Sequence, residues 1–506
     1  MTHSKGIVVF SGGSAANSLV DVFEAVRENK ACPLSYIIPI SDNGGSSSEL
    51  IRVFGGPGIG DVRSRLVRLI PTDPSSPERL AISQLFNHRL SSTSSVDAAA
   101  EWQLIVSGAA DLWHGIPSAK KELIRSFFNL LNLEILKRSR PSSPFDFTSA
   151  SVGNLFLTGA RLFSGSFESA IYLLSSICAI PEEVHVIPSI NSNFSHHIAA
   201  GLVNGDVIVG QNNISHPAAA TSLAMPIIGD GPPIPARTHH SVDHSEDIED
   251  ANIPGTLPTL RQKNINFSKD EDEDLPARIE RIWYINPYGQ EMLPPANPRV
   301  FSAVKHAQAI VYSIGSLYTS VVPSIVLRGV GEALHSSPAR QKILILNGSL
   351  DRETGPSSDP FSAFDFVEAI ARACEQSRGN PWRPELRKSC SDDNLKTSRA
   401  TLSAGVHGNL LVPGSSFKMT QRAERNSIYR QYVTHVIHLN GEGTPKVDKE
   451  RLAAVGIDCL KLYGRKSAKG VMLYDAQALI GALEAILGRK GDGMLLSRSR
   501  RNTMEA

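Results

Sequence analysis

Short apolar runs alternate with glycine-rich turns and helical patterns over residues 6–70. GIVVF at 6–10 and LSYIIPI at 34–40 predict two buried strands. Apolar residues at helical spacing predict helices over 19–26 and 62–70. Strand, glycine turn, helix and strand in this order are typical of a parallel sheet, so the pattern predicts an α/β fold.

Similar helical and strand patterns continue over most of the chain. They predict helical structure over 100–138 and helices at 153–163 and 168–178, followed by strands over 183–213 that suggest a small antiparallel excursion. IERIWYINP, AIVYSIG and KILILNG predict three further strands of α/β type, and YVTHVIHLNG predicts another. A helix running into a strand at 451–462 and a closing helix at 478–487 complete the pattern.

Two segments break this periodicity and predict disordered, low-complexity insertions at 229–278 and 377–428. Proline, serine and acidic residues dominate them, and such composition buries too little apolar area to offset the entropy of ordering. Three histidines at 239, 240 and 244 lack a partner at metal-ligand spacing. We therefore expect one α/β domain built from 1–228, 279–376 and 429–490, with a frayed tail at 491–506.

Composition narrows the class of protein. The 506 residues would fit one large domain with insertions or two domains. A net charge of +1 gives no general attraction to nucleic acid or membranes. No apolar run is long enough for a membrane helix, the N-terminus has no signal-peptide pattern, and the five cysteines show no CxxC spacing. We expect a soluble, cytoplasmic protein that binds neither nucleic acid nor membrane.

The first candidate site is FSGGSAANS at 10–18, directly after a predicted strand. Gly12 and Gly13 allow a sharp turn that exposes backbone N–H groups, and Ser14 and Asn17 could cap the next helix, whose N-terminus favours an anion. The segment lacks the GxGxxG spacing of a dinucleotide site. It is either a phosphate-binding loop or a tight turn.

Two further glycine-rich segments follow the second predicted strand. In SDNGGSSS, Asp42 ends the strand and Gly44, Gly45 and the serines from Ser46 onward could line an anion pocket. The alternative makes Asp42, Asn43 and Gly44 a simple turn. In GGPGIGDVRSRL, Asp61 either caps a helix or joins Asp42 as a ligand of Mg²⁺, with Arg63 contacting phosphate.

The fourth segment is SIGSLYTSVVPSIVLRGVGEAL at 313–334, where Gly315 and Ser316 again join a strand to a helix. Donors at the start of that helix suit an anion. The segment has no Gly-x-Ser-x-Gly elbow and no Cys/His pair, so it predicts no nucleophile. No catalytic residue is predicted elsewhere.

Together these segments resemble the 2-phospho-L-lactate transferase (CofD-like) family, and more closely its branch of YvcK-type gluconeogenesis factors. The matching pieces come in family order: the Gly-Gly loop, SDNGGSSSELIR, GDVRSRLVRL, SVGNLFLTGA and IGSLYTSVVPSIVLRGVGEAL, then KILILNGSLDRETG. The likeness spans about 6–377 and 430–487. Two turns depart from the family pattern, at 12–15 and 313–316, where the family usually has Gly-Gly-Thr-Gly and Gly-Pro-Gly-Ser.

The resemblance implies a Rossmann-like, mostly parallel sheet with helices on both faces, and a nucleotide-diphosphate or nucleotide-sugar ligand. It places the metal-binding aspartates on Asp42 and Asp61, implies Mg²⁺ as cofactor, and matches Asn154 to a Gly-Asn pair near the nucleotide. The predicted nucleotide-binding set is Gly12, Gly13, Ser14, Asn17, Asn43, Gly44, Gly45, Ser46, Arg63, Asn154, Gly315, Ser316, Leu317 and Tyr318.

Two functions remain open from the sequence. One is an enzyme that transfers a phospholactyl-type group from a nucleotide-diphospho donor with Mg²⁺. The other is a non-catalytic regulator of carbon metabolism that binds UDP-sugars, as YvcK-type members do. A nicotinamide dehydrogenase is disfavoured because the dinucleotide fingerprint is missing. A homodimer is left open as the oligomeric state.

Overall fold

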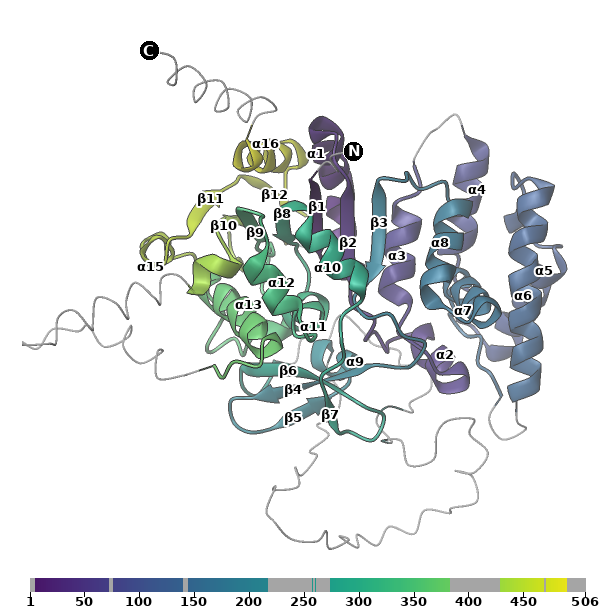
Figure 1. Ribbon diagram of the computed structural model, residues 1–506. Helices are drawn as coiled ribbons and strands as arrows, with labels where there is room; N and C mark the ends of the chain where they lie inside the picture. Colours follow the sequence, from purple (N-terminus) through teal and green to yellow (C-terminus); the bar gives the residue numbers. More distant parts are fainter. Residues whose placement is uncertain are drawn as a thin grey trace, which may run out of the picture.

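Seven parallel strands form the central sheet of the computed structural model, in the order β11-β10-β9-β8-β1-β2-β3 (Figure 1). The structure describes residues 5–71, 76–139, 144–216, 257, 260, 274–382, 428–467 and 470–488. The strands are β1 (Gly6–Phe10), β2 (Leu34–Ile38), β3 (Val184–Pro188), β8 (Ala307–Tyr312), β9 (Gln341–Ile345), β10 (His435–His438) and β11 (Asp458–Lys461). The predicted parallel α/β sheet is confirmed.

The strand order reverses between β1 and β8. From β1 the chain winds outward through β2 to β3, then returns to the middle and winds the other way from β8 to β11. Open sheets of this kind bind ligands beyond the carboxyl ends of the strands at such a switch point. The topology therefore directs attention to the loops that follow β1 and β8.

Helices cover both faces of the sheet, as predicted. α10 (Pro298–Lys305), α12 (Val330–Ser336) and α13 (Ala363–Ser377) pack on one another, and α1 (Val20–Lys30) packs on α16 (Ala476–Leu487). α13 illustrates why these segments are helical: Ser362 and Asp365 form a capping box, and the helix then buries Phe366, Val367 and Ile370.

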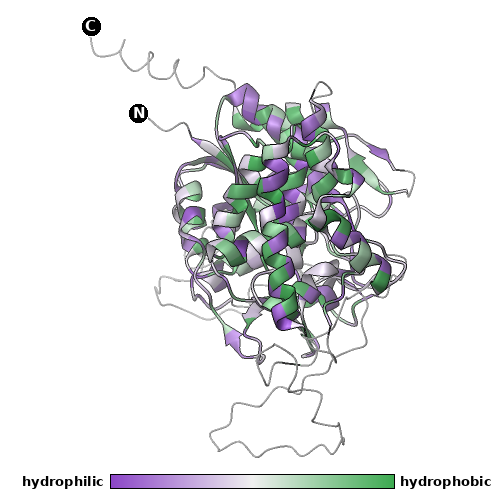
Figure 2. Ribbon diagram, turned by 90° about the vertical axis from the view of Figure 1, so that its right-hand side faces the viewer, coloured by the Kyte–Doolittle hydropathy of each residue, from purple (hydrophilic) through white to green (hydrophobic). Residues whose placement is uncertain are grey.

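A group of helices extends beyond the β3 edge, on the right in Figure 1. They are α4 (Pro77–Asn87), α5 (Ser95–Ser107), α6 (Ser118–Arg138), α7 (Val152–Ser164) and α8 (Phe167–Ile177). Their inner faces meet in an aromatic cluster that includes Phe86, Trp102, Phe128 and Phe156. Figure 2 views this side and shows hydrophilic and hydrophobic residues mixed along each helix, the pattern of helices with one buried face.

The predicted antiparallel excursion is a separate four-stranded sheet, in the order β5-β4-β6-β7. It consists of β4 (His197–Leu202), β5 (Val207–Val209), β6 (Ile279–Ile285) and β7 (Glu291–Met292). The short helix α9 (Gln211–Ser215) follows β5, and a hairpin of β12 (Gly464–Lys466) and β13 (Met472–Tyr474) precedes α16. β3, which the sequence suggested within the same run of strands, belongs instead to the parallel sheet.

Most of the two predicted insertions, and the tail, lie outside the described residues. Where their ends are described they are part of the packed structure: Leu275 is 1% exposed, and Arg278 pairs with Asp359 and Asp365. The C-terminal stretch closes the same sheet, because β10 pairs with β9. None of the helices in the described part of the chain is long and apolar enough to cross a membrane.

Candidate functional site

One cavity of about 360 Å³ lies at the carboxyl ends of β1, β2 and β8. The loops that follow these three strands line it together with the first turn of α3, so all four predicted segments contribute to its wall. We call it the aspartate cavity. Its walls include residues 13–15 after β1, Asp42 and 44–47 after β2, Gly60, Asp61 and Arg63 from the start of α3 (Gly60–Arg68), and Ser316, Thr319 and Ser320 after β8. The structure thus brings most of the predicted residues together.

Asp42 lies in the loop after β2, and the residues that follow it hold its carboxylate. One oxygen accepts the Gly44 N–H at 3.0 Å and the other accepts the Ser47 hydroxyl at 3.1 Å. The hydrogen bond from Gly44 closes an Asx-turn, so the predicted turn is present. The same turn also positions the Asp42 carboxylate at the cavity. The turn also fixes the carboxylate against Gly60 at the start of α3.

Asp61 lies in the first turn of α3, but it does not cap that helix. The cap position is Ile59, which has no side-chain hydrogen bond to the helix. The Asp61 carboxylate instead accepts the Gly13 N–H, across from the loop after β1. The capping alternative is therefore wrong for Asp61, and its side chain joins two loops at the cavity.

Burial and mutual repulsion set the electrostatics of the two aspartates. Burial raises the pKa of Asp42, and burial together with the neighbouring Asp42 charge raises the pKa of Asp61 to about 7. Two partly buried carboxylates in this state favour a proton or a cation between them. Carboxylate and hydroxyl oxygens suit Mg²⁺, which commonly takes one or two carboxylates and completes its shell with water and phosphate.

The donor set therefore fits a cation that a ligand phosphate also contacts. No cluster of three or more His, Cys, Asp or Glu side chains suited to a metal occurs in the described part of the chain. Two carboxylates are too few for a complete protein cage, so any cation here would need an anionic ligand and water to complete its shell.

Glycines allow the loops to approach these aspartates closely. A Cβ on Gly13 would collide with Asp61 Oδ1 and lie 2.9 Å from the Asp61 Cα, and a Cβ on Gly60 would collide with Asp42 Oδ2. A Cβ on Gly12 would lie 2.5 Å from Ser320 Oγ. The glycines are thus required by packing at the cavity, which is a firmer reason than a tight turn alone.

Arg63, Asn154 and Ser46 form a chain of hydrogen bonds along one wall. Arg63 Nε donates to Asn154 Oδ1 at 3.2 Å, and Asn154 Nδ2 donates to Ser46 Oγ at 3.1 Å. Burial, followed by the nearby Arg89 charge, lowers the pKa of Arg63 to about 10, so the guanidinium remains charged at neutral pH. Arg63 and Arg89 both line the cavity and bring positive charge to it, which acts on Asp42.

Arg65 of α3 holds the loop after β1 through hydrogen bonds to its carbonyl groups. The sequence analysis did not predict this role. Arg65 is 0% exposed, donates to the Gly12 carbonyl at 3.0 Å and the Ala16 carbonyl at 3.3 Å, and lies over the Tyr36 ring. Ser14 occupies the cap position of the following 3-10 turn, but without the predicted side-chain bond, and Asn17 donates to Ser64 Oγ at 2.8 Å instead. The loop is therefore held by α3 more than by its own caps.

The loop after β8 forms a short π-helix, Leu317–Val321, whose start is held by Glu353. One Glu353 oxygen accepts the Tyr318 N–H at 2.9 Å and the Thr319 N–H at 3.0 Å, and the other accepts the Thr319 hydroxyl. Burial, followed by the nearby Asp351, raises the pKa of Glu353 to about 8. A single turn of π-helix is common at functional sites.

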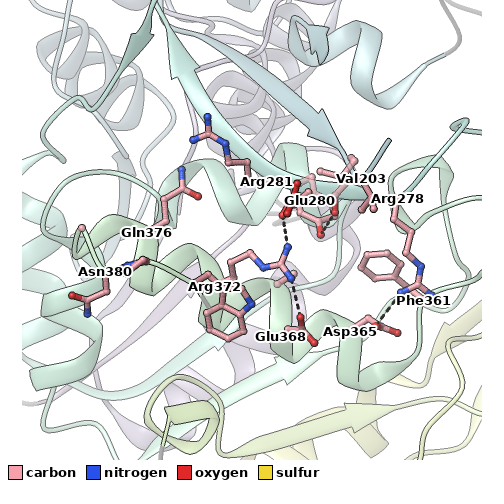
Figure 3. Close-up of a pocket in the computed structure, with 16 residues that line it drawn as sticks. Val203, Arg278, Glu280, Arg281, Phe361, Asp365, Glu368, Arg372, Gln376 and Asn380 are labelled. Atoms are coloured by element: carbon pink, nitrogen blue, oxygen red, sulfur yellow. Dashed lines mark hydrogen bonds and ion pairs between the residues drawn. The ribbon is translucent and has the colours of Figure 1, made fainter. Parts of the chain in front are cut away.

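Leu317 and Tyr318, two predicted nucleotide-binding residues, do not belong to the wall of the aspartate cavity. Leu317 is buried, and Tyr318 donates from its hydroxyl to the Ile279 carbonyl at 3.1 Å. Tyr318 instead lines a different cavity of about 770 Å³. Figure 3 shows this cavity between β6 and α13. There Arg372 pairs with Glu368 and Arg278 with Asp365, so these charges are balanced and attract a phosphate less.

α9 supplies a side of the cavity that the sequence analysis missed. The aspartate cavity is also lined by Gln211, Asn212, Ser215 and His216. Asn43, next to Asp42, holds α9 in this position, because its Oδ1 accepts the Asn212 N–H at 3.0 Å. The sequence pattern predicted strand structure up to residue 213. The polar run after it carries no periodic signal that would place it beside Asp42.

Comparison with known proteins finds a family match over most of the chain. The profile of the family described as "2-phospho-L-lactate transferase CofD" matches residues 7–405. A Saccharomyces cerevisiae protein, "Uncharacterized protein YNL011C", is 44% identical over 386 residues, which cover 74% of this chain and 85% of the yeast protein. The "Gluconeogenesis factor" of Halalkalibacterium halodurans is 22% identical over 372 residues, covering 73% and 74%.

A solved structure shares the fold. The crystal structure of a UPF0052 family member from Bacillus halodurans superposes with a TM-score of 0.52 at 18% identity, covering 96% of this chain and all of that one. The profile match spans the loops that build the aspartate cavity as well as most of the sheet. The chain therefore belongs to the 2-phospho-L-lactate transferase CofD family.

Proposed function

We propose that the protein binds a nucleotide-diphosphate ligand with its diphosphate in the aspartate cavity, together with Mg²⁺. The observation that carries this proposal is the convergence of Asp42, Asp61 and three strand-end loops on one cavity at the switch point of the sheet. Family membership supports the same class of ligand.

The residues of the cavity have distinct parts in this proposal. Asp42 and Asp61 would hold the Mg²⁺, which neutralises phosphate charge when bound. Arg63 and Arg89 lie in the same wall and complement the remaining negative charge. The loop after β1 lines the cavity with Ser14 and Ala15, whose backbone N–H groups would donate to phosphate oxygens, and Ser316 and Ser320 would add hydroxyl donors.

The candidate activity is transfer of a phospholactyl-type group from a nucleotide-diphospho donor to the hydroxyl of an acceptor. The acceptor oxygen would bond to the transferred phosphorus and lose its proton, while the phosphoanhydride bond breaks and the nucleoside monophosphate leaves. Such a reaction needs positioning and charge neutralisation more than a protein nucleophile, which suits a cavity lined by serines, glycines and arginines. The alternative is a UDP-sugar-binding regulator without turnover. Relatives named gluconeogenesis factor, which match over about three quarters of this chain, favour it.

A thermal-shift panel tests the binding proposal. GDP, UDP, UDP-glucose, UDP-N-acetylglucosamine and NAD would each be added to the full chain with and without Mg²⁺. Binding stabilises the native state by RT ln(1 + [L]/Kd), so a nucleotide diphosphate at a hundred times its Kd should add about 2.7 kcal/mol. We expect a shift that Mg²⁺ enlarges for nucleotide diphosphates and none for NAD. No shift with any of them would refute the proposal.

Turnover separates the enzyme from the regulator. The ligand that gives the largest shift would be incubated with catalytic amounts of protein and Mg²⁺, with and without added alcohols as acceptors, and the nucleotide products would be followed by chromatography. Release of the free nucleotide above the rate of an Asp61→Asn variant supports an enzyme. Intact ligand after long incubation supports the regulator.

A further inference from the structure

The cavity of about 770 Å³ between β6 and α13 is separate from the aspartate cavity (Figure 3). We call it the arginine cavity, because Arg278, Arg281 and Arg372 line it. Its volume is in the range of roughly 300–1,000 Å³ that is typical of small-molecule sites. The described residues that line the two cavities have no member in common, so a molecule bound here would be a second ligand.

Aromatic rings form much of the apolar wall of the arginine cavity. Tyr318 and Phe361 meet edge to face with their ring centroids 6.2 Å apart, and Trp382 lines the cavity beyond them. Ile279 of β6 and Ala369 of α13 add aliphatic surface. Such a wall favours a ligand with an apolar or aromatic body.

The three arginines already have carboxylate partners. The ion pairs are Arg278 with Asp359 and Asp365, Arg281 with Glu291, and Arg372 with Glu368. Two of these arginines also lie over aromatic rings, Arg278 over Phe361 and Arg372 over Trp382. An anionic ligand would have to compete with the carboxylates for every guanidinium group, so the arginines do not make this cavity an anion site.

Glu280 gives the cavity an excess of negative charge. Among the described residues its carboxylate has no ion-pair or hydrogen-bond partner, and its side chain is exposed at the cavity. With the four paired carboxylates it makes five against three guanidinium groups. Arg372 donates to the Glu280 carbonyl at 2.6 Å and so fixes the backbone here. The charge that this cluster would attract is therefore positive.

Tyr318 connects the arginine cavity to the aspartate cavity. It lines the first, and its neighbour Thr319 lines the second. One Glu353 oxygen accepts the N–H groups of both residues, and the Tyr318 hydroxyl donates to the Ile279 carbonyl of β6 at 3.1 Å. A ligand that packs on Tyr318 therefore favours the arrangement of this loop that lines the aspartate cavity.

We propose that the arginine cavity is a second ligand site, which binds a small amine carried on an apolar or aromatic body, with the amine at Glu280, and that the bound amine tightens nucleotide binding through Tyr318. The coupling rests on the proposed function, whereas the amine site does not. By thermodynamic linkage, the nucleotide must tighten amine binding by the same factor.

Three phenyl compounds that differ in charge test the ligand class: 2-phenylethylamine, 2-phenylethanol and 3-phenylpropionate. Binding to the full chain would be followed by tryptophan fluorescence, because Trp382 lies at the cavity, and Trp382→Phe should remove the ligand-dependent change. We expect the amine to bind about threefold or more tighter than the alcohol, the strength of an exposed ion pair, and the carboxylate to bind most weakly.

Glu280→Gln should abolish the preference for the amine over the alcohol. Glu182→Gln, at an exposed glutamate just before β3, is the matched control and should keep it. Equal binding of the three compounds, a preference that survives Glu280→Gln, or a signal that survives Trp382→Phe would each overturn the amine site.

The coupling is measured by titrating UDP and GDP, each with Mg²⁺, in the presence and absence of saturating 2-phenylethylamine. We expect the amine to lower the nucleotide Kd by about fivefold or more. An unchanged or raised Kd would overturn the coupling while leaving the proposed function standing. A wild type that binds the amine but neither nucleotide would overturn the proposed function, and the coupling with it, and would leave the amine site standing.

Discussion

Substitution of Asp61 is the most direct test of the proposed Mg²⁺ site. Asp61 accepts the Gly13 N–H, and its pKa is raised to about 7 by burial and by Asp42. Asp61→Asn keeps the size of the side chain and one oxygen acceptor but removes the charge that Mg²⁺ requires. We expect the factor by which Mg²⁺ tightens nucleotide binding to fall to about one, because a neutral amide is a weak ligand for a hard cation.

Two measurements keep this result interpretable. The melting temperature of the metal-free Asp61→Asn protein should equal or exceed that of the wild type, since the substitution removes repulsion with the neighbouring Asp42. Asp206→Asn, at an exposed turn of the small sheet, should leave both properties unchanged. A variant that folds and still shows the full Mg²⁺ effect would exclude Asp61 as a ligand.

Gly13 tests how closely the phosphate loop must approach α3. A Cβ at this position would collide with Asp61 Oδ1, so Gly13→Ala must displace either the loop or the carboxylate. We expect nucleotide affinity with Mg²⁺ to fall by about tenfold or more and stability to fall by about 1–3 kcal/mol, as for other overpacked sites. Titration and chemical denaturation of the same variant measure the two effects.

Gly481→Ala is the matched control for that substitution. Gly481 lies in α16, and a Cβ there would meet nothing within 4 Å. Alanine should stabilise this helix by up to about 1 kcal/mol and leave nucleotide binding unchanged. If Gly13→Ala also left nucleotide binding unchanged, the close contact between Gly13 and Asp61 would not be needed for binding.

At the scale of elements, the loop after β8 depends on a single buried carboxyl group. Glu353 accepts two backbone N–H groups and one hydroxyl from Tyr318 and Thr319. Glu353→Gln can accept the two N–H groups with its carbonyl and donate to the Thr319 oxygen, so we expect near-wild-type nucleotide affinity. Glu353→Ala leaves the N–H groups unpaired, at about 1–3 kcal/mol each, and should weaken binding.

The same residue predicts a pH dependence with a definite sign. Its pKa is raised from an ordinary value of 4.5 to about 8, so between these pH values the folded chain binds a proton that the unfolded chain does not. Its contribution to stability therefore decreases as pH rises from about 4.5 to about 8 and is constant on either side. Glu353→Gln should remove this slope from the unfolding free energy. An unchanged slope would place the titration elsewhere.

These elements also show what sequence reasoning could reach. Asp42, Asp61 and Arg63 were predicted because parallel strands carry their following loops to one edge, a consequence of short-range pattern alone. Arg65, Glu353 and α9 were missed because their roles arise from contacts between segments far apart in sequence: Arg65 contacts Gly12, and Asn43 contacts Asn212. An acidic residue in a loop carries no periodic signal that it will be buried.

The limits of the first predicted insertion can be tested at the scale of the whole molecule. Replacing residues 229–254 with a flexible linker of about ten residues should leave nucleotide Kd within a few-fold, because loop length costs little entropy. Binding would be measured on the full chain and on the shortened one. Complete loss of binding in a folded variant would assign the replaced segment to the site.

A nearby substitution marks where the dispensable part ends. Leu275 was predicted to lie in the insertion, yet it is 1% exposed and belongs to the core. Leu275→Ala should cost about 2–5 kcal/mol. A loss below 1 kcal/mol would mean that the core at this point is loose.

The last prediction concerns how the C-terminal region completes the molecule. The family profile ends at residue 405, but β10 and β11 extend the same sheet beyond that point. The Tyr312 hydroxyl donates to the Tyr432 carbonyl at 3.0 Å, and the Lys342 N–H donates to Thr434 Oγ1 at 2.8 Å. Ending the chain at 427 would remove these partners and leave β9 as an unpaired apolar edge, so we expect aggregation and no cooperative unfolding transition. Ending it at 488 removes only residues beyond α16 and should shift the melting temperature by less than about 2 °C. Circular dichroism melts of both truncations decide the point: a chain ending at 427 that melts cooperatively near the wild-type temperature would show that the sheet is stable without its last two strands.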